Sequence, residues 1–253
     1  MLTSRKHPRV LEWTELNARP RSDAAIAEGP HLALEALRDA EVMVLLITDE
    51  FAAAAEGAKI VDLSRARGVE LALMTAAVYA KISALRQPEG VAVVFRPRQF
   101  SLPEIFSRRR LLVAAGVQDP GNAGALARVA EAAGFDGCVF TGGVNPLKEK
   151  FLRAAMGSAF RLPCLKSDTS AVLAAARTNN LPLFVAAAAA DATDYRRVEF
   201  PARYAVVVGG EGQGVPPEIR AAAAAVIQIP LTPPVESLNV AVAAGVILFQ
   251  GAR

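Results

Sequence analysis

Apolar and polar positions along this chain fall into two series of short blocks. In the first series, the expected elements are helices over residues 30–40 and 75–85 and strands over residues 42–47, 69–73 and 91–95. These elements predict a compact α/β unit. The segment that follows, residues 96–103, contains two prolines and several charges without a clear period, which is typical of a linker.

The second series begins near residue 111 and is longer. The pattern predicts strands over 111–115, 138–140, 162–165, 183–187, 204–208 and 226–229, and helices over 122–133, 147–155, 170–177, 217–225 and 237–249. Apolar strands that alternate with helices indicate a parallel sheet covered by helices on both faces. We therefore expect two domains, residues 1–105 and residues 106–253, with the linker at about 96–110.

Composition supports two folded, soluble domains. The chain has 253 residues, of which 53% are hydrophobic and 21% are charged, so both domains can bury a core. No apolar stretch is long enough to cross a membrane, and the first residues lack the apolar core of a secretion signal. We therefore expect a cytoplasmic protein without membrane contact. Cys138, Cys164, His7 and His31 are too few and too scattered for a zinc site, so no metal is expected.

Positive charge in this chain is concentrated rather than large. The net charge is +3, yet residues 1–21 and 96–110 each carry an excess of arginine and lysine, and the first of these stretches includes Arg5, Lys6 and Arg9. Such a run forms either an ordinary solvated face or a surface for nucleic acid. The sequence pattern leaves both interpretations open.

Three segments contain polar or glycine residues that packing does not require. The first, D-P-G-N-A-G-A-L-A-R over residues 119–128, is either a helix start that binds an anion with Arg128 nearby or a plain helix start capped by Asn122. The second, V-V-V-G-G-E-G-Q-G-V over residues 206–215, either lets the backbone approach a nucleotide-type ligand or forms a turn without one. Its spacing is not that of a P-loop or a dinucleotide fingerprint.

The third segment, I-P-L-T-P-P-V-E-S-L-N-V-A-V-A over residues 229–243, leads into the last expected helix. Ser237 is a good N-cap for that helix. Asn239 is then an unfavourable residue two positions inside an apolar helix, unless its side chain bonds something specific. That partner is either a ligand or a structural group.

In this order, the three segments resemble motifs one, two and three of the SpoU (TrmH-type) RNA ribose 2′-O-methyltransferases of the SPOUT superfamily. Residues 3–17 and 28–31 resemble the N-terminal RNA-binding domain, similar to a ribosomal-protein fold, of members that modify rRNA. The resemblance implies an α/β catalytic domain whose parallel sheet carries a deep trefoil knot. It also implies S-adenosyl-L-methionine as the cofactor, RNA as the substrate, and a homodimer with the site at the subunit interface.

The resemblance further implies roles for individual residues. The positions that match the family's cofactor pocket are Gly209, Glu211, Gly212, Ile229, Leu231, Ser237, Leu238 and Asn239. The positions that match polar groups around the target ribose, and hence the catalytic candidates, are Asn122, Arg128, Glu211 and Asn239. The candidates for RNA contacts are Arg5, Lys6, Arg9 and Arg128.

The implied reaction is the attack of a ribose 2′-hydroxyl on a sulfonium methyl group. Arg128 is the family's candidate for activating that hydroxyl, but a guanidinium stays protonated and has no acceptor. We therefore favour a role for Arg128 in binding the adjacent phosphate and stabilising the developing alkoxide.

The N-terminal resemblance favours 23S-type rRNA as the target, and tRNA ribose methylation is the alternative within the same chemistry. Two alternatives lie outside that chemistry. One is a catalytically silent RNA-binding protein or ribosome assembly factor, and the other is a different nucleotide-binding α/β enzyme that binds ATP or NAD.

Overall fold

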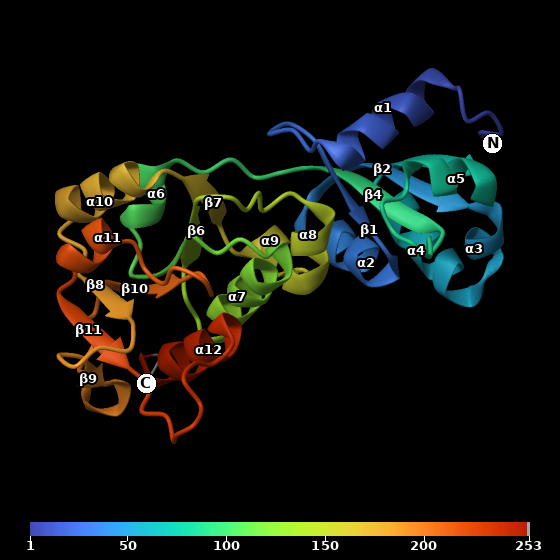
Figure 1. Ribbon diagram of the computed structural model, residues 1–253. Helices are drawn as coiled ribbons and strands as arrows, with labels where there is room; N and C mark the ends of the chain where they lie inside the picture. Colours follow the sequence, from blue (N-terminus) through green and yellow to red (C-terminus); the bar gives the residue numbers. More distant parts are fainter. Residues whose placement is uncertain (252–253) are drawn as a thin grey trace. The chain divides into compact units, whose positions relative to one another are not determined.

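The structure, a computed structural model, describes residues 1–251 and divides into two compact units (Figure 1). The first unit contains Met1–Gln99 together with Leu147–Arg161, and the second contains Phe100–Pro146 and the chain from Leu162 onward. The sequence pattern places the domain change near residue 105 and assigns Leu147–Arg161 to the second domain. The contacts of that segment place it in the first unit instead.

A four-stranded sheet forms the centre of the first unit, in the order β1 (Ala25–Glu28), β4 (Val91–Arg96), β2 (Glu41–Thr48) and β3 (Glu70–Met74). Strand β4 is antiparallel to β1 and β2, whereas β2 and β3 are parallel. The helices of this unit are α1 (Pro8–Ala18), α2 (Pro30–Asp39), α3 (Asp49–Ala53), α4 (Ala55–Ala66), α5 (Ala76–Ile82), α8 (Glu149–Ala155) and α9 (Ser158–Arg161). The expectations from the sequence did not include α1, β1, α3, α4 or α9.

Two contacts of α9 join it to the first unit. The ring of Phe160 meets the ring of Phe95 edge-on, with centroids 5.1 Å apart. Arg161 forms ion pairs with Glu35 at 2.5 Å and with Asp39 at 3.0 Å. An aromatic pair and a branched ion pair therefore join this segment to α2 and β4.

A buried carboxylate ties three elements of the first unit together. Glu28, at the end of β1, is only 2% exposed. Its Oε1 accepts hydrogen bonds from Asn17 Nδ2 at 2.7 Å and from the backbone N of Ala84 at 2.8 Å, and its Oε2 accepts one from Ser83 Oγ. Asn17 Nδ2 also donates to the carbonyl of Ile82 at 2.9 Å. These bonds satisfy the buried charge and join the end of α1 to β1 and to the end of α5.

The second unit is a seven-stranded sheet in which every neighbouring pair is parallel. Its strands, in spatial order, are β7 (Cys164–Ser167), β6 (Gly137–Thr141), β5 (Arg110–Ala115), β10 (Tyr204–Gly209), β8 (Leu183–Ala186), β11 (Ala225–Gln228) and β9 (Thr193–Asp194). The helices are α6 (Leu102–Phe106), α7 (Pro120–Ala132), α10 (Thr169–Thr178), η1 (Tyr195–Arg197), α11 (Pro217–Ala221) and α12 (Val240–Gly251). The expected parallel sheet is confirmed.

The order of the strands determines where a site can form. Strand β10 lies between β5 and β8, although both precede it in the chain. Strands β6 and β7 extend the sheet on one side, and β8, β11 and β9 extend it on the other. At such a reversal of strand order, the loops after the carboxyl ends of neighbouring strands diverge and leave room for a ligand. Within residues 1–251, no helix combines the length and apolar character that a membrane crossing requires.

Candidate functional site

The first motif begins α7 directly after β5. The Asp119 side chain accepts a hydrogen bond from the backbone N of Asn122 at 2.9 Å, so Asp119 is the N-cap. The interpretation of Asn122 as the cap is wrong, because Pro120 occupies the first helical position and the helix starts earlier. The Asn122 side chain is therefore available to partners outside its own helix.

A chain of hydrogen bonds joins one residue from each of the three motifs. Asn239 Nδ2 donates to Asn122 Oδ1 at 3.1 Å, and Asn122 Nδ2 donates to Glu211 Oε1. Asn122 follows β5, Glu211 follows β10, and Asn239 precedes α12. The fold thus brings together three of the four catalytic candidates.

Asn239 also caps the last helix. Its Oδ1 accepts hydrogen bonds from the backbone N of Ala241 at 2.9 Å and of Val242 at 3.4 Å, and α12 begins at Val240. The expected cap at Ser237 is therefore wrong, and the helix starts three residues later than expected. Asn239 is tolerated because it lies before the helix, where a side-chain acceptor satisfies free amides.

The glycines of the second motif serve the packing of the loop. A Cβ at Gly209 would collide with the backbone of Gly214 and Val215, and one at Gly210 would collide with the carbonyl of Gly116. The loop after β10 therefore folds against itself and against the loop after β5. The close approach that these two glycines allow is between backbone segments rather than between backbone and ligand.

A cavity of about 300 Å³ opens beside this loop. Six of the eight cofactor candidates line it: Gly209, Glu211, Ile229, Leu231, Ser237 and Leu238. Gly212 and Asn239 are not part of the lining, although each is next in sequence to a residue that is. The cavity therefore collects most of the expected residues from the ends of β10 and β11 and from the segment before α12.

Sequence reasoning missed several lining residues: Ala186, Ala187, Ala188, Val208, Gly210, Gly214, Ile227, Gln228, Glu236, Val240, Ala243 and Ile247. The alanines at 186–188 belong to a run whose composition alone suggests no role, yet they lie at the end of β8 and directly after it, at the carboxyl edge of the sheet. Their signal was their place after an apolar strand, because that edge is where parallel sheets bind ligands. Glu236 brings a second carboxylate to the lining.

Arg128 is the one catalytic candidate that the structure does not bring to this cluster. It lies on α7, six residues after Asn122, which places it about 120° around the helix from that residue. Its side chain is exposed and makes no hydrogen bond or ion pair within the described chain. It is also not among the residues that line the cavity.

The basic N-terminal candidates are partly engaged within the first unit. Arg9 pairs with Glu70 at 2.6 Å and stacks over the Trp13 ring, 4.7 Å from its centroid. Arg5 Nε donates to a backbone carbonyl of α5 at 2.9 Å, and Lys6 is exposed. Ion pairs as exposed as that of Arg9 contribute little to stability, so a phosphate can replace Glu70 at small cost.

The arginines of the linker also have partners in the first unit. Arg96 pairs with Glu41 at 2.7 Å, and Arg98 donates to the carbonyl of Asp39 at 3.0 Å. These residues hold the end of β4 and the following segment against the unit.

The sequence of the second unit identifies its relatives. Residues 109–249, more than half of the chain, match the model of the SpoU rRNA Methylase family. The chain belongs to this family. Similar proteins include the 23S rRNA (guanosine(2553)-2′-O)-methyltransferase RlmP of Bacillus subtilis, which is 27% identical over 98% of both chains. An uncharacterized tRNA/rRNA methyltransferase of Synechocystis is 30% identical over 100% of this chain and 93% of the relative.

Solved structures agree with the family assignment. The crystal structure of an AdoMet-bound rRNA methyltransferase from Sinorhizobium meliloti matches with a TM-score of 0.84 at 27% identity. The match covers 99% of this chain and 96% of that one. Both units, and not only the SpoU region, therefore have a counterpart of the same fold.

The cavity of this SpoU family member suits S-adenosylmethionine, the cofactor of the family. Its apolar walls, which include Val208, Ile227 and Ile247, suit an adenosine, and its two carboxylates, Glu211 and Glu236, suit a cation. None of the described residues that line it is lysine or arginine. A cofactor with phosphate groups, such as ATP or NAD, would meet carboxylates without a counter-charge.

Proposed function

We propose that this protein is an S-adenosyl-L-methionine-dependent RNA methyltransferase that transfers a methyl group to a ribose 2′-hydroxyl. The observation that carries the proposal is the hydrogen-bond chain from Asn239 through Asn122 to Glu211 beside a cavity without basic side chains. It sets amide and carboxylate groups, which suit the hydroxyls of a ribose, next to an apolar pocket that suits an adenosine.

The residues of the chain bind the ribose and take up its proton. Bound S-adenosylmethionine supplies a methyl group on a positively charged sulfur. Glu211 Oε2 has no partner in the described structure, so it accepts the hydrogen bond of the 2′-hydroxyl and withdraws the proton as the oxygen attacks. Asn122 orients this carboxylate, and Asn239 orients Asn122. Positioning by these residues contributes to the rate because it makes the transfer effectively unimolecular.

Arg128 binds the phosphate next to the target ribose in this proposal. Its exposed guanidinium has no partner in residues 1–251, and it has no acceptor with which to serve as a base. A fixed positive charge near the reacting oxygen also stabilises a developing alkoxide. Arg128 thus favours the transition state without exchanging a proton.

We propose a homodimer in which two subunits complete each site. Support comes from α12, the helix that follows Asn239. Its residues Val242 and Phe249 are 54% and 52% exposed and, seven positions apart, form one exposed apolar face of the helix. Exposed apolar stripes of this kind mark interaction surfaces. A partner subunit would also explain why Arg128 does not reach the cavity of its own chain.

We further propose that the C-terminal segment is threaded as a trefoil knot and that the protein acts in the cytoplasm. The knot is supported by the insertion of β10 between β5 and β8 and by the return of the chain from β11 to Asn122. A ribosomal RNA substrate agrees with a cytoplasmic location.

The target that we propose is 23S-type rRNA, and the first unit is its RNA-binding domain. Support comes from the similarity to RlmP, which extends over 98% of both chains and so includes the first unit. A tRNA target is the alternative, because the Synechocystis relative is named for both RNA classes.

Titration calorimetry with S-adenosylmethionine tests the cofactor, with ATP and NAD as controls. We expect saturable binding of S-adenosylmethionine alone, weakened in Asn239→Ala. Transfer of a labelled methyl group to rRNA, followed by alkaline hydrolysis, then tests the product, because a 2′-O-methyl group blocks cleavage at that nucleotide. Folded protein that binds RNA but neither binds the cofactor nor transfers a labelled methyl group would be a catalytically silent assembly factor. Transfer of the methyl group to a base would contradict methylation of the ribose.

A further inference from the structure

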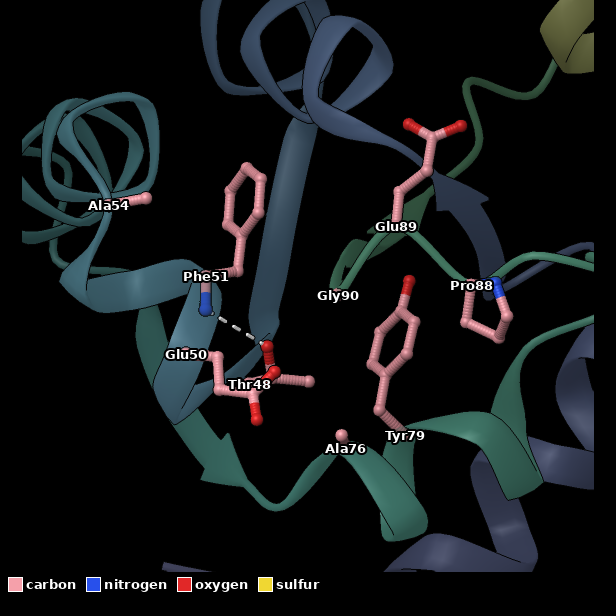
Figure 2. Close-up of a pocket in the computed structure, with 9 residues that line it drawn as sticks. All are labelled: Thr48, Glu50, Phe51, Ala54, Ala76, Tyr79, Pro88, Glu89 and Gly90. Carbon is pink, nitrogen blue, oxygen red and sulfur yellow. Dashed lines mark hydrogen bonds between the residues drawn. The ribbon is translucent and has the colours of Figure 1, made fainter.

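A second cavity, of about 340 Å³, lies wholly within the first unit (Figure 2). It forms where the parallel strands β2 and β3 end and where β4 begins. Three short segments line it: Thr48 at the end of β2 with Glu50, Phe51 and Ala54 after it, Ala76 and Tyr79 on α5, and Pro88 to Gly90 before β4. The cavity therefore occupies the carboxyl edge of a parallel strand pair, the usual place for a ligand in such sheets.

Hydrogen bonds and a close backbone approach hold the wall of this cavity. Thr48 Oγ1 accepts a hydrogen bond from the backbone N of Phe51 at 3.2 Å, and the backbone N of Thr48 donates to the carbonyl of Gly90 at 2.8 Å. A Cβ at Gly90 would lie 2.8 Å from Thr48 Oγ1, so the chain passes too close for any side chain there. Tyr79 is buried and donates to the carbonyl of Val91 at 2.7 Å.

Phe51 and Glu50 are the groups that this wall offers to a ligand. The Phe51 ring is half-buried, and the Glu50 carboxylate is exposed without an ion pair in the described chain. Glu89 is also exposed, but Figure 2 shows its carboxylate turned away from Tyr79. It lies toward Gly29 at the start of α2, where a Cβ would be 3.0 Å from its Oε2. A half-buried aromatic ring and one free carboxylate therefore both line the cavity, and they extend from α3 in different directions.

Basic residues border the cavity without entering it. Arg5 Nε donates to the carbonyl of Ala77 at 2.9 Å, one residue from the lining residue Ala76. Leu2 forms a β-bridge with Met74 at the end of β3, so the basic N-terminal stretch runs along this edge. Arg86, exposed, precedes the third lining segment. The charge pattern is thus one exposed carboxylate in the lining, Glu50, with basic residues at the border of the cavity.

We propose that this cavity binds one unpaired guanine of the RNA, a nucleotide other than the one that is methylated. The inference rests on the proposed RNA-binding role of the first unit. Guanine alone among the four bases has two adjacent donors, N1–H and N2–H, on its Watson–Crick edge, and one carboxylate can accept both. The base stacks on Phe51 and pairs with Glu50, while Arg5 holds a neighbouring phosphate.

The charge pattern favours a base over a phosphate or a base-paired helix. A phosphate is repelled by Glu50, and a paired guanine has already used both of its donors. Readout of unpaired bases on aromatic rings is the usual basis of sequence-specific RNA binding. A cationic side chain or polyamine is the competing occupant, since it too complements a carboxylate beside a ring.

Fluorescence anisotropy with the full chain tests the proposal. The probes are labelled nine-nucleotide RNAs of uridine with one central guanosine, inosine or adenosine, where inosine lacks only the N2 amino group. We expect the guanosine probe to bind about tenfold more tightly than the adenosine probe, with inosine between them. Glu50→Gln should abolish this preference, and Ala76→Leu, which fills the cavity from an exposed position, should do the same.

Glu12→Gln, which removes an exposed carboxylate from α1, is the matched control and should keep the preference. Equal binding of the three probes overturns the guanine site and leaves RNA binding intact. A Glu50→Gln variant that binds all probes more tightly, or spermine that competes only when Glu50 is present, would assign the cavity to cations. No binding of any RNA by protein that still binds S-adenosylmethionine overturns the guanine site and the RNA-binding role of the first unit, but not the cofactor site.

Discussion

Asn239 Nδ2 donates a hydrogen bond to Asn122 Oδ1 over 3.1 Å and so joins two residues that are 117 positions apart in sequence. The oxygen of the same amide caps α12. One side chain therefore sets the start of the last helix and holds Asn122, which in turn binds Glu211 in the lining of the cofactor cavity. Because the two roles use different atoms, substitution can separate them.

Replacing Asn239 by aspartate should impair activity without loss of stability. Asn239→Asp keeps the oxygen that caps α12 but loses the donor to Asn122, so we expect a free energy of unfolding within about 0.5 kcal/mol of the wild type. We expect kcat/KM for methyl transfer to fall at least about tenfold. Asn239→Ala should lose activity and also about 1 kcal/mol of stability. Urea unfolding and methyl-transfer rates measure the two effects, and a fully active Asn239→Asp would contradict the proposed role.

Replacing Glu28 by alanine should destabilise the first unit. The substitution leaves the buried donors of Asn17, Ser83 and Ala84 without their acceptor, and we expect a loss of about 3 kcal/mol. Urea unfolding measures this loss. Binding of S-adenosylmethionine should persist at low urea, because Glu28 is not part of the cofactor cavity. A loss below about 1 kcal/mol would mean that water replaces the carboxylate without cost.

Asp194 should titrate well below an ordinary aspartate. Hydrogen bonds from the Arg196 side chain, at 2.5 to 3.1 Å, are the main cause that lowers the pKa of Asp194 from 3.8 to about 2. Because the pKa of Asp194 is lower in the folded state than in the unfolded state, the ionised carboxylate stabilises the folded protein. This contribution is fully present above about pH 4 and is lost as the pH falls toward 2. Carbon NMR should show the low midpoint in the wild type and a rise toward 3.8 in Arg196→Ala. An unchanged midpoint in the variant would exclude this cause.

A charge on α12 should separate the proposed dimer. Val242→Glu places a carboxylate on the exposed apolar face of α12, where burial against a partner would be costly. Light scattering should then give the mass of one chain instead of two. Leu11→Glu is the matched control, since Leu11 is similarly exposed, at 49%, on α1 of the other unit. A wild-type protein that is monomeric in the same measurement would contradict the proposal that two subunits complete each site.

The local sequence pattern was enough to predict most helices and strands of the second unit, but it did not predict the elements at the start of the first unit. Strands such as β5 and β8 are short apolar runs, and their length and the flanking turn residues together indicate strands. Helix α1 buries Trp13 and Leu16 but presents polar residues elsewhere, and β1 has four residues, so neither has a strong local signal. Their stability comes from contacts with α5 and β4, which are distant in sequence.

The candidate site shows the same division. The motifs identified Asn122, Glu211 and Asn239, and these residues do meet in the structure. The helix caps were assigned to neighbouring residues, because cap choice depends on where the first helical turn closes and several nearby side chains can serve. Glu236 had no local signal, and the alanines at the end of β8 had only their place after an apolar run, since they line the cavity through the position of that strand in the sheet.

The sequence by itself determined most helices and strands of the second unit, though not α6, β9 or η1, as well as the parallel sheet and the three segments that carry polar groups. These properties follow from local periodicity and from turn chemistry. Only the tertiary structure decided that β10 lies between β5 and β8, that Leu147–Arg161 belongs to the first unit, and that Asn239 reaches Asn122. Such pairings depend on which buried faces complement each other across the whole chain, and no short stretch of sequence contains that information.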